Sequence, residues 1–332
     1  MKVFDQIRTA ALCAVLGGLL MACSEGTSPV TTDAEVVQPE PMVFLTSHGA
    51  LGSSGAAAGI MKPLLEASLQ RPIEFKHNQG ATAAIGVAPD GNTMLMSVIG
   101  VMALNPVLIP GFDMDPLTDL RPVTRVITTP DFLIVRSSLG IKTIQELVEY
   151  AANSLEPLSY WHIAPTSIHR VEFAAIFNEF GIDNVKLDTR VGNGPVGAIE
   201  AIRNSTLDLL VLTSPYTIPM IGEGSATPLV VIHPTRLPLY PGVPTLLEKG
   251  VTTMPNGSWA GLFVPAGTSD EDVEEVFQAF RHAASDPATV KRINDLGMEV
   301  DLNESPADFV EYLQSETVRL KIAVDKYQVG TD

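Results

Sequence analysis

The stretch Met42–Leu69 (MVFLTSHGALGSSGAAAGIMKPLLEASL) constrains the fold most, because it predicts a buried strand, a glycine- and serine-rich turn and a helix in succession. The strand is expected over Val43–Ser47 and the helix from about Ser54. Free N–H groups and the positive dipole end at a helix start favour an anion there. A tight turn that binds nothing is the alternative. Three glycines without a Cβ let the backbone of the turn approach a ligand closely: Gly49, Gly52 and Gly55.

A second loop of this kind is APTSIH, Ala164–His169. It follows a predicted strand and opens a predicted helix. Thr166 or Ser167 can cap that helix or hydrogen-bond a bound carboxylate. His169 can face a ligand or pack against the core as a structural histidine. The loop therefore predicts a second helix start that is suited to an anion.

A third loop, GNGPVG (Gly192–Gly197), has the G-x-G-x-x-G pattern of dinucleotide sites. No clear acidic residue ends a strand about twenty positions later, and an exported protein has no supply of the dinucleotide, so we reject that function. What remains is another helix start with an approachable backbone. Arg190, just before it, is either a partner for a carboxylate or an ordinary surface residue. The three loops supply these candidate ligand-binding residues: Ser47, Ala50, Ser53, Ser54, Thr166, Ser167, His169, Arg190, Asn193 and Gly194.

Strand-like runs alternate with helical runs along the rest of the chain, which is typical of a mainly parallel α/β architecture. Ile73–His77 and Thr93–Val98 are predicted strands. Thr143, followed three residues later by Glu146, predicts a capping box, and Ser305 predicts another capped helix start.

The N-terminus has the features of a targeting segment. Lys2 and Arg8 precede an apolar stretch, Thr9–Ala22, that is too short to span a bilayer comfortably. Its end, Leu-Met-Ala-Cys, resembles a bacterial lipobox, so we expect Cys23 to be lipidated; an ordinary signal peptide that contains a cysteine is the alternative. Residues 1–22 are thus a predicted lipoprotein signal peptide, and the polar, proline-punctuated residues 23–41 a predicted disordered tether.

Composition and motifs exclude several function classes. A formal net charge of -17 argues against nucleic acid as a partner. Cys13 is removed with the signal peptide, which leaves one cysteine and no disulfide framework or thiol metal site. The chain has no G-x-S-x-G elbow, no H-E-x-x-H motif and no clustered His/Cys/Asp metal set. We therefore expect no enzyme, no metal and no other cofactor.

Four blocks resemble the motifs of the tripartite tricarboxylate transporter receptors, the TctC or Bug extracytoplasmic solute-binding proteins. The resemblance runs from about Val43 to Lys326, nearly all of the mature domain. The blocks are PDGNTMLM (Pro89–Met96), ALNPVLI (Ala103–Ile109), YPGVPTLLEKGV (Tyr240–Val251) and WAGLFVPAGTSDE (Trp259–Glu271).

This resemblance implies an α/β fold of the type II periplasmic-binding-protein class, with two lobes and a ligand cleft between them. It implies that residues 42–135 and 259–332 form lobe 1 and that residues 136–258 form lobe 2. The family's carboxylate-binding loops match Ser47–Ser54, Pro165–His169 and Gly192–Gly194 here.

The function implied is a lipid-anchored receptor facing the periplasm. It captures a small organic dicarboxylate or tricarboxylate, aromatic acids included, and presents it to a membrane transporter or a sensor. We expect a monomer that contacts the membrane only through its lipid anchor.

Two departures from the family pattern bear on the ligand. Gly55 stands where the family usually has an aspartate, and Gly59 where it has an arginine, which puts an amino-acid-like ligand in doubt. Trp161 and His162 replace a small S-P-G segment, so they either shape a bulkier pocket or pack in the core. The alternative function is a diverged structural or signalling lipoprotein with a non-functional cleft.

Overall fold

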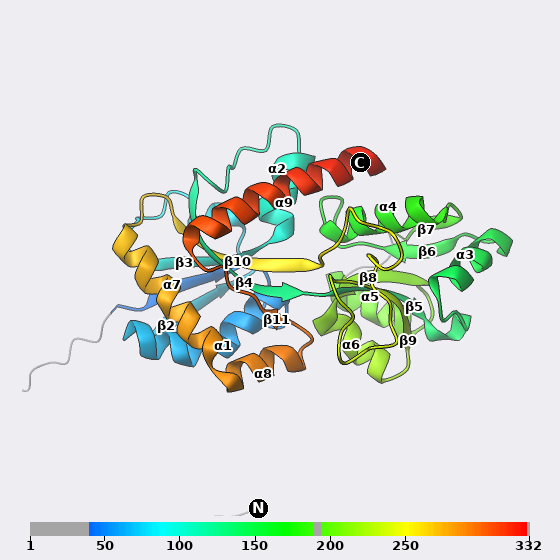
Figure 1. The fold of residues 1–332 in the computed structure, drawn as a ribbon, viewed down its shortest axis with the longest axis horizontal. Helices are drawn as coiled ribbons and strands as arrows, with labels where there is room; N and C mark the ends of the chain where they lie inside the picture. Colours follow the sequence, from blue (N-terminus) through cyan, green and yellow to red (C-terminus); the bar gives the residue numbers. More distant parts are fainter. Residues whose placement is uncertain (1–39, 189–193, 331–332) are drawn as a thin grey trace, which may run out of the picture. The chain divides into compact units, whose positions relative to one another are not determined.

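The computed structural model describes residues 40–188 and 194–330. These residues form two β-sheets, each with helices on both faces, as the predicted α/β class requires (Figure 1). Cys23, Arg190 and Asn193, which the sequence singled out, lie outside the described residues.

The first sheet is six-stranded and mixed. Its strands are β1 (Met42–Thr46), β2 (Ile73–His77), β3 (Thr93–Val98), β4 (Leu120–Thr129), β10 (Ser258–Pro265) and β11 (Glu299–Val300). They lie in the order β11-β4-β10-β3-β1-β2. β1 pairs in parallel with both β2 and β3, whereas β10 runs antiparallel to β3 and β4.

The second sheet is five-stranded, in the order β7-β6-β8-β5-β9. Its strands are β5 (Asp131–Arg136), β6 (Leu158–Trp161), β7 (Val185–Leu187), β8 (Leu209–Thr213) and β9 (Ala226–Ile232). β6 is parallel to β7 and β8, so β6 and β8 have their carboxyl ends at the same edge of the sheet.

Helices cover both faces of the first sheet because its strands alternate their apolar side chains. Phe44 faces one core with Leu65 and Phe280, while Leu45 faces the other with Phe309. The first core lies under α1 (Ser53–Leu69), α7 (Asp270–Ser285) and α8 (Pro287–Asp295). The second lies under η2 (Gly100–Leu104), α2 (Asn105–Leu108) and α9 (Pro306–Tyr327).

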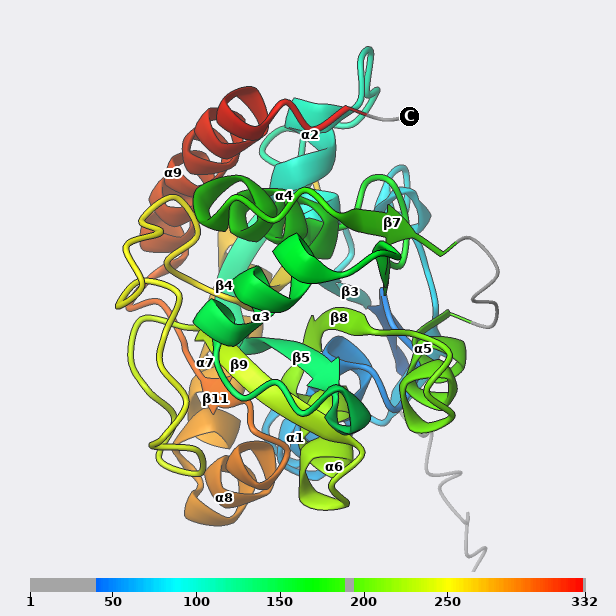
Figure 2. The same cartoon turned by 90° about the vertical axis from the view of Figure 1, so that its right-hand side faces the viewer.

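The second sheet is covered in the same way. Leu133 of β5 packs toward α3 (Ile144–Asn153) and α4 (Ile168–Phe180). Phe132 faces the opposite side, toward α5 (Gly194–Arg203) and α6 (Ser214–Gly222). Helix α9 also contacts α4, so one core cluster continues from the first sheet into the second (Figure 2). Short 3₁₀ turns complete the elements at Ala81–Ala84 and Ser137–Leu139.

Within the part of the chain that the structure describes, no helix combines the length and the apolar character needed to cross a membrane.

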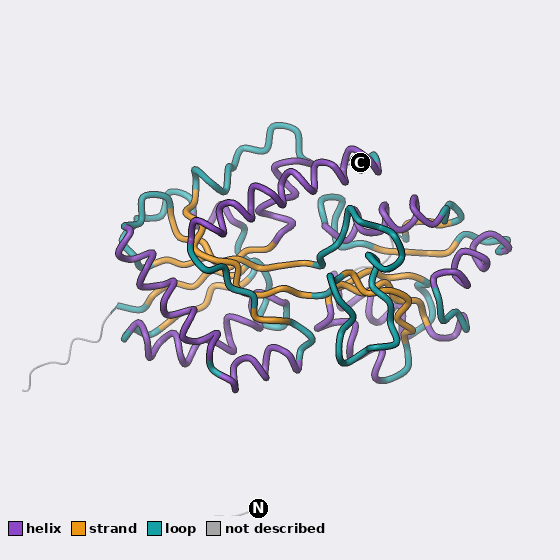
Figure 3. The backbone as a smooth tube through the Cα atoms, viewed as in Figure 1, coloured by secondary structure: helices purple, strands orange, loops and turns teal. Residues whose placement is uncertain are grey.

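The chain crosses between the sheets at two adjacent places (Figure 3). Pro130 alone separates β4 from β5, so the first sheet leads directly into the second. β10 begins beside this crossing, where Ser258 lies opposite Thr129. β5 pairs with β8 and β9, which places it in the second sheet, whereas the sequence analysis had assigned residues up to Val135 to the first lobe.

Helix α6 was not predicted, because its sequence SPYTIPMIG contains two prolines. Pro215 falls in the first turn, where its missing N–H removes no helical hydrogen bond. Pro219 lies inside the helix, and the short element is held by the burial of Thr217 and Met220.

Asp208 ties three strands of the second sheet together. Its carboxylate accepts hydrogen bonds from the Ser159 N–H at 2.8 Å and the Ser159 hydroxyl at 2.7 Å. It also pairs with Arg136 at 2.7 Å. Burial disfavours the charged carboxylate, but these partners outweigh burial and hold the pKa of Asp208 below its ordinary value.

We expect Asp208→Asn to lower the free energy of unfolding by about 1.5–3 kcal/mol at neutral pH, the usual range for hydrogen bonds to a charged group. A depressed native pKa stabilises the fold above the unfolded value of about 3.9, and this contribution is lost as pH falls through the native pKa. Urea titrations of wild type and variant should therefore differ at neutral pH and converge at an acidic pH below the native pKa of Asp208. Asp295→Asn, at an exposed pair with Lys291, is the control. An equal difference at both pH values would contradict this account.

Candidate functional site

A cavity of about 340 Å³ lies at the carboxyl ends of strands from both sheets. Ligand sites of open α/β sheets occupy this position. The loops after β1, β3, β6 and β8 and the start of β10 supply most of its wall. The lining residues are His48, Gly49, Ser53, Asn78, Val98, Ile99, Gly100, Val101, Asn105, Ile163, Ala164, Thr166, Ser167, Ile168, His169, Pro195, Leu212, Thr213, Tyr216 and Ser258.

Helix starts around this cavity lack side-chain caps. α1, α4 and α6 begin after Gly52, Ser167 and Thr213, and none of these residues accepts a hydrogen bond from its helix through a side chain. Ser53, Ser167 and Thr213 line the cavity, so the first turns of these helices border it. Their N–H groups and dipoles make this wall electropositive without a basic side chain.

Four other helices, α3, α7, α8 and α9, begin with a conventional side-chain cap. Thr143 accepts from Glu146 N at the start of α3, as the capping box predicted. Ser269, Asp286 and Ser305 cap α7, α8 and α9 in the same way. The starts of α1, α4 and α6 lack such a cap and border the cavity, so a bound anion can take the place of the cap there.

The loop after β1 folds tightly against the start of α1. His48 N donates to Ser54 Oγ at 3.1 Å, and Gly52 N donates to Gly49 O at 2.9 Å. A Cβ on Gly55 would lie 2.2 Å from Gly49 O, so only glycine fits there. In this conformation the loop leaves no room for the aspartate that the resemblance led us to expect at position 55.

The loop after β6 contributes polar groups that the protein itself leaves without partners. Ser167 Oγ is buried and has no hydrogen-bond partner among the described residues. Trp161 and His162, which precede this loop, are buried and do not line the cavity. Trp161 packs in the core with Phe132, so the core alternative applies to it.

A buried polar cluster lies where this loop meets the crossing strands. Asp131 and Glu172 are fully buried, and His169, which lines the cavity, is 5% exposed. Asp131 Oδ2 accepts hydrogen bonds from Ser258 N at 2.9 Å and Ser258 Oγ at 2.8 Å. Burial and the neighbouring Asp131 carboxylate raise the pKa of Glu172 well above its ordinary value. Burial, followed by the charge of His169, lowers the pKa of His48 on the facing wall.

The structure brings together only part of the predicted set. Ser53, Thr166, Ser167 and His169 line the cavity. The other described candidates do not: Ser47 donates to Ser97 Oγ at 2.8 Å, Ser54 accepts from His48, and Ala50 lines a different cavity. Gly194 starts α5 with a φ of 60°, next to the lining residue Pro195.

Sequence reasoning missed other lining residues, including Asn78, Asn105, Tyr216 and Ser258. It also missed Asp131 and Glu172. The available signal was a single acidic residue in each of two apolar runs, PDFLIV and RVEFAAIF. Acidic residues are rarely buried without a special role, so these two positions deserved notice.

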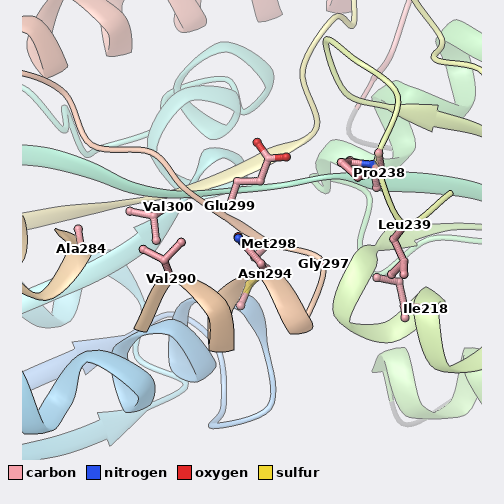
Figure 4. A pocket seen from close by; sticks show the side chains of 11 residues that line it. Ile218, Pro238, Leu239, Ala284, Val290, Asn294, Gly297, Met298, Glu299 and Val300 are labelled. Atoms are coloured by element: carbon pink, nitrogen blue, oxygen red, sulfur yellow. The ribbon is translucent and has the colours of Figure 1, made fainter. Parts of the chain in front are cut away.

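A larger cavity of about 570 Å³ lies between α6 and α8 (Figure 4). Its wall is mostly apolar and includes Ile218, Leu239 and Val290. Among its lining residues the charged one is Glu299, which pairs with His233 at 3.4 Å. A carboxylate in this cavity would lie near the negative charge of Glu299, and no uncapped helix start in the described part of the chain borders it. The smaller cavity is therefore the candidate anion site.

Comparisons with known proteins show which sequences and structures this chain resembles. Residues 73–329 match the model described as "Tripartite tricarboxylate transporter family receptor". Protein BugT of Bordetella pertussis is 24% identical over 297 residues, which cover 84% of this chain and 86% of BugT. The family match covers most of the region, from about Val43 to Lys326, over which the resemblance was seen in the sequence.

Solved structures show the same architecture. MatC from Rhodopseudomonas palustris with bound malate has a TM-score of 0.75 at 24% identity, covering 86% of this chain and 99% of MatC. Another R. palustris protein, solved with adipate, has a TM-score of 0.80 at 20% identity, covering 88% of this chain and 98% of its own. The expected periplasmic-binding-protein fold is thereby confirmed.

Proposed function

We propose, from the premise that this chain belongs to the tripartite tricarboxylate transporter receptor family, that it captures a small organic dicarboxylate in the 340 Å³ cavity. Members of this family are solute-binding receptors of the periplasm and not enzymes. Beyond membership of that class, the proposal specifies the binding site, the chemistry of the ligand and the membrane attachment of this chain.

The uncapped starts of α1, α4 and α6 carry the proposal. A carboxylate has two oxygens that accept hydrogen bonds from first-turn N–H groups, and it is further stabilised by the helix dipoles. Among the described lining residues there is no lysine or arginine, so backbone groups and hydroxyls would supply the recognition. Ser167, with its unpartnered hydroxyl, is the side chain best placed to add a hydrogen bond.

The rest of the wall favours a ligand with a hydrocarbon middle. Ile99, Ile163, Leu212 and Tyr216 present apolar surface between the polar loops. The cavity volume lies near the lower end of the range for small-molecule sites, about 300 Å³ upward. A short aliphatic or compact aromatic diacid satisfies both conditions, and the two ligand-bound relatives hold malate and adipate.

Membrane attachment and delivery complete the proposal. Cys23 would carry the lipid, and the polar segment up to Pro41 would tether the domain to the membrane. The loaded receptor, as a monomer, would then present its solute to a transporter of the tripartite tricarboxylate type or to a sensor.

The experiment is a ligand screen on the full chain in detergent, with aliphatic dicarboxylates from succinate to adipate, malate and aromatic acids. A ligand at 100 times its Kd stabilises the folded state by about 2.7 kcal/mol, which corresponds to a rise in Tm of about 5 °C for a chain of this size. Dimethyl esters of the same acids serve as controls and should give no shift. No shift with any acid would contradict the proposal.

One observation favours the alternative of a non-functional cleft. The loop after β1 satisfies part of its own hydrogen-bonding capacity, through His48 N to Ser54 and Gly52 N to Gly49. The same screen separates the two functions, because a cleft without a ligand leaves Tm unchanged for every acid.

A further inference from the structure

Asp131, His169 and Glu172 meet at one point although they are far apart in sequence. Asp131 is the first residue of β5, immediately after the crossing at Pro130. His169 and Glu172 lie one turn apart on α4. One ligand-type atom of each residue lies within 4.8 Å of those of the other two. The fold therefore gathers one imidazole and two carboxylates.

These groups are buried without sufficient partners. Asp131 and Glu172 are fully buried and His169 is 5% exposed. His169 Nε2 lies 3.5 Å from Asp131 Oδ1, in reach of a charge interaction but without hydrogen-bond geometry. Among the described residues, the following buried atoms have no hydrogen-bond partner: Asp131 Oδ1, both ring nitrogens of His169 and both carboxylate oxygens of Glu172. Folded proteins rarely leave such groups unsatisfied.

We propose that Asp131, His169 and Glu172 bind a divalent metal ion of the Zn²⁺ or Mn²⁺ class. A proton shared by the two carboxylates would satisfy one pair of oxygens and leave the imidazole without a partner. A divalent cation accepts one donor atom from each residue and balances both carboxylate charges. Ligand atoms bound at about 2.0–2.2 Å in a tetrahedral site lie about 3.3–3.6 Å apart. His169 Nε2 and Asp131 Oδ1 already lie 3.5 Å apart, and a separation as wide as the 4.8 Å limit would contract by about 1.2 Å on binding the metal.

The donor set selects the class of metal. Imidazole nitrogen with carboxylate oxygen suits Zn²⁺, Mn²⁺ and related ions, whereas Ca²⁺ and Mg²⁺ prefer oxygen ligands only. Three protein ligands leave coordination positions open, which is typical of sites that bind a further molecule. His169 lines the cavity, so the metal site would adjoin it.

The surroundings support the site. Ser258 donates to Asp131 Oδ2 through its N–H at 2.9 Å and its hydroxyl at 2.8 Å, which fixes the carboxylate and leaves Oδ1 for the metal. Arg319 is the nearby cation that acts on Glu172. It forms an ion pair with Glu316 at 2.8 Å, which balances its charge and limits its repulsion of a metal.

The metal would also supply a positive charge that the described cavity wall lacks. A carboxylate oxygen of the solute can occupy an open coordination position while the helix starts hold its other oxygens. This last step rests on the proposed function; metal binding itself does not.

The first test uses metal alone. Chelator-treated full chain in detergent is titrated by calorimetry with Zn²⁺ and then with Mn²⁺, without any organic acid. We expect binding of one ion per chain. Glu172→Gln and His169→Asn should each weaken binding by about 100-fold or more, since disturbing only the outer partners of a metal ligand costs about 10–100-fold. Glu179→Gln, an exposed glutamate on the same helix, is the matched control and should bind like wild type.

Failure to bind, or binding that both cluster variants retain, overturns the site. Co²⁺ absorption of the wild-type chain gives a test that does not depend on folded variants: visible bands with an imidazole–carboxylate environment support the site, and the spectrum of the free aqueous ion opposes it. Addition of an acid that raises Tm should then change these bands. Unchanged bands would overturn the contact between metal and solute, and an absent Tm shift would instead count against the proposed function.

Discussion

Ser167→Asp should weaken dicarboxylate binding by about 100-fold or more, which corresponds to about 2.7 kcal/mol, while leaving the unliganded protein as stable as wild type or slightly more so. Ser167 is the N-cap residue of α4 and its hydroxyl caps nothing. Aspartate is among the best N-cap residues, so its carboxylate would accept from the first-turn N–H groups and favour the helix. It would thereby take the place, and repel the charge, of the ligand carboxylate.

Two controls separate the effect of charge from the effect of side-chain size. Ser167→Asn introduces a cap of similar volume without charge and should cost less affinity than aspartate does. Ser269→Asp changes a conventional cap on α7, which lies away from the cavity, and should leave affinity unchanged. Calorimetric titration gives the affinity and a thermal melt gives the stability. Wild-type affinity in Ser167→Asp would show that the start of α4 does not hold the ligand.

Gly257→Ala should lower the free energy of unfolding by about 3 kcal/mol, the upper part of the usual range for overpacking. An added Cβ would lie 2.5 Å from Thr129 O, 2.7 Å from Ile232 O and 2.9 Å from Asp131 N. All three atoms belong to backbone at the crossing between the sheets, so no side chain can rotate away to make room. The substitution therefore has to displace one of the crossing segments.

The matched control is Gly242→Ala in the same connection between β9 and β10. A Cβ there would have no neighbour within 4 Å, so we expect a change of less than about 0.5 kcal/mol. Urea unfolding of both variants measures the difference. If the Gly257→Ala variant proved as stable as the Gly242→Ala variant, the result would contradict the close packing of backbone around Gly257.

Much of the fold was predictable because local sequence and tertiary packing agree. β2 and β3 have the bounds expected from their apolar residues, Ile73–His77 and Thr93–Val98. The caps at Thr143 and Ser305 were predictable because each capping side chain accepts a hydrogen bond from an N–H only three residues further along the chain. Strand-forming runs and helix caps depend on residues that are close in sequence, so the sequence alone predicts them.

Features that depend on distant segments were not predictable in this way. β5 belongs to the second sheet through hydrogen bonds to β8 and β9, which no local pattern reveals. Asp131 meets His169 and Glu172 only through the fold, so the metal-type cluster was missed. The loops after β1 and β6 lie between a strand and a helix as the sequence predicted, yet Ser47 and Ser54 hydrogen-bond to partners within the protein. The orientation of a side chain within a loop depends on neighbouring residues from other parts of the chain, which the sequence of the loop does not reveal.

The most direct measurement is a crystal structure of the full chain with the dicarboxylate that gives the largest rise in Tm. The account predicts one ligand carboxylate within hydrogen-bond distance of the first-turn N–H groups of α1 and α4, inside the 340 Å³ cavity. A ligand seated instead in the cavity between α6 and α8, or helix starts whose N–H groups are filled by the protein's own side chains, would contradict it.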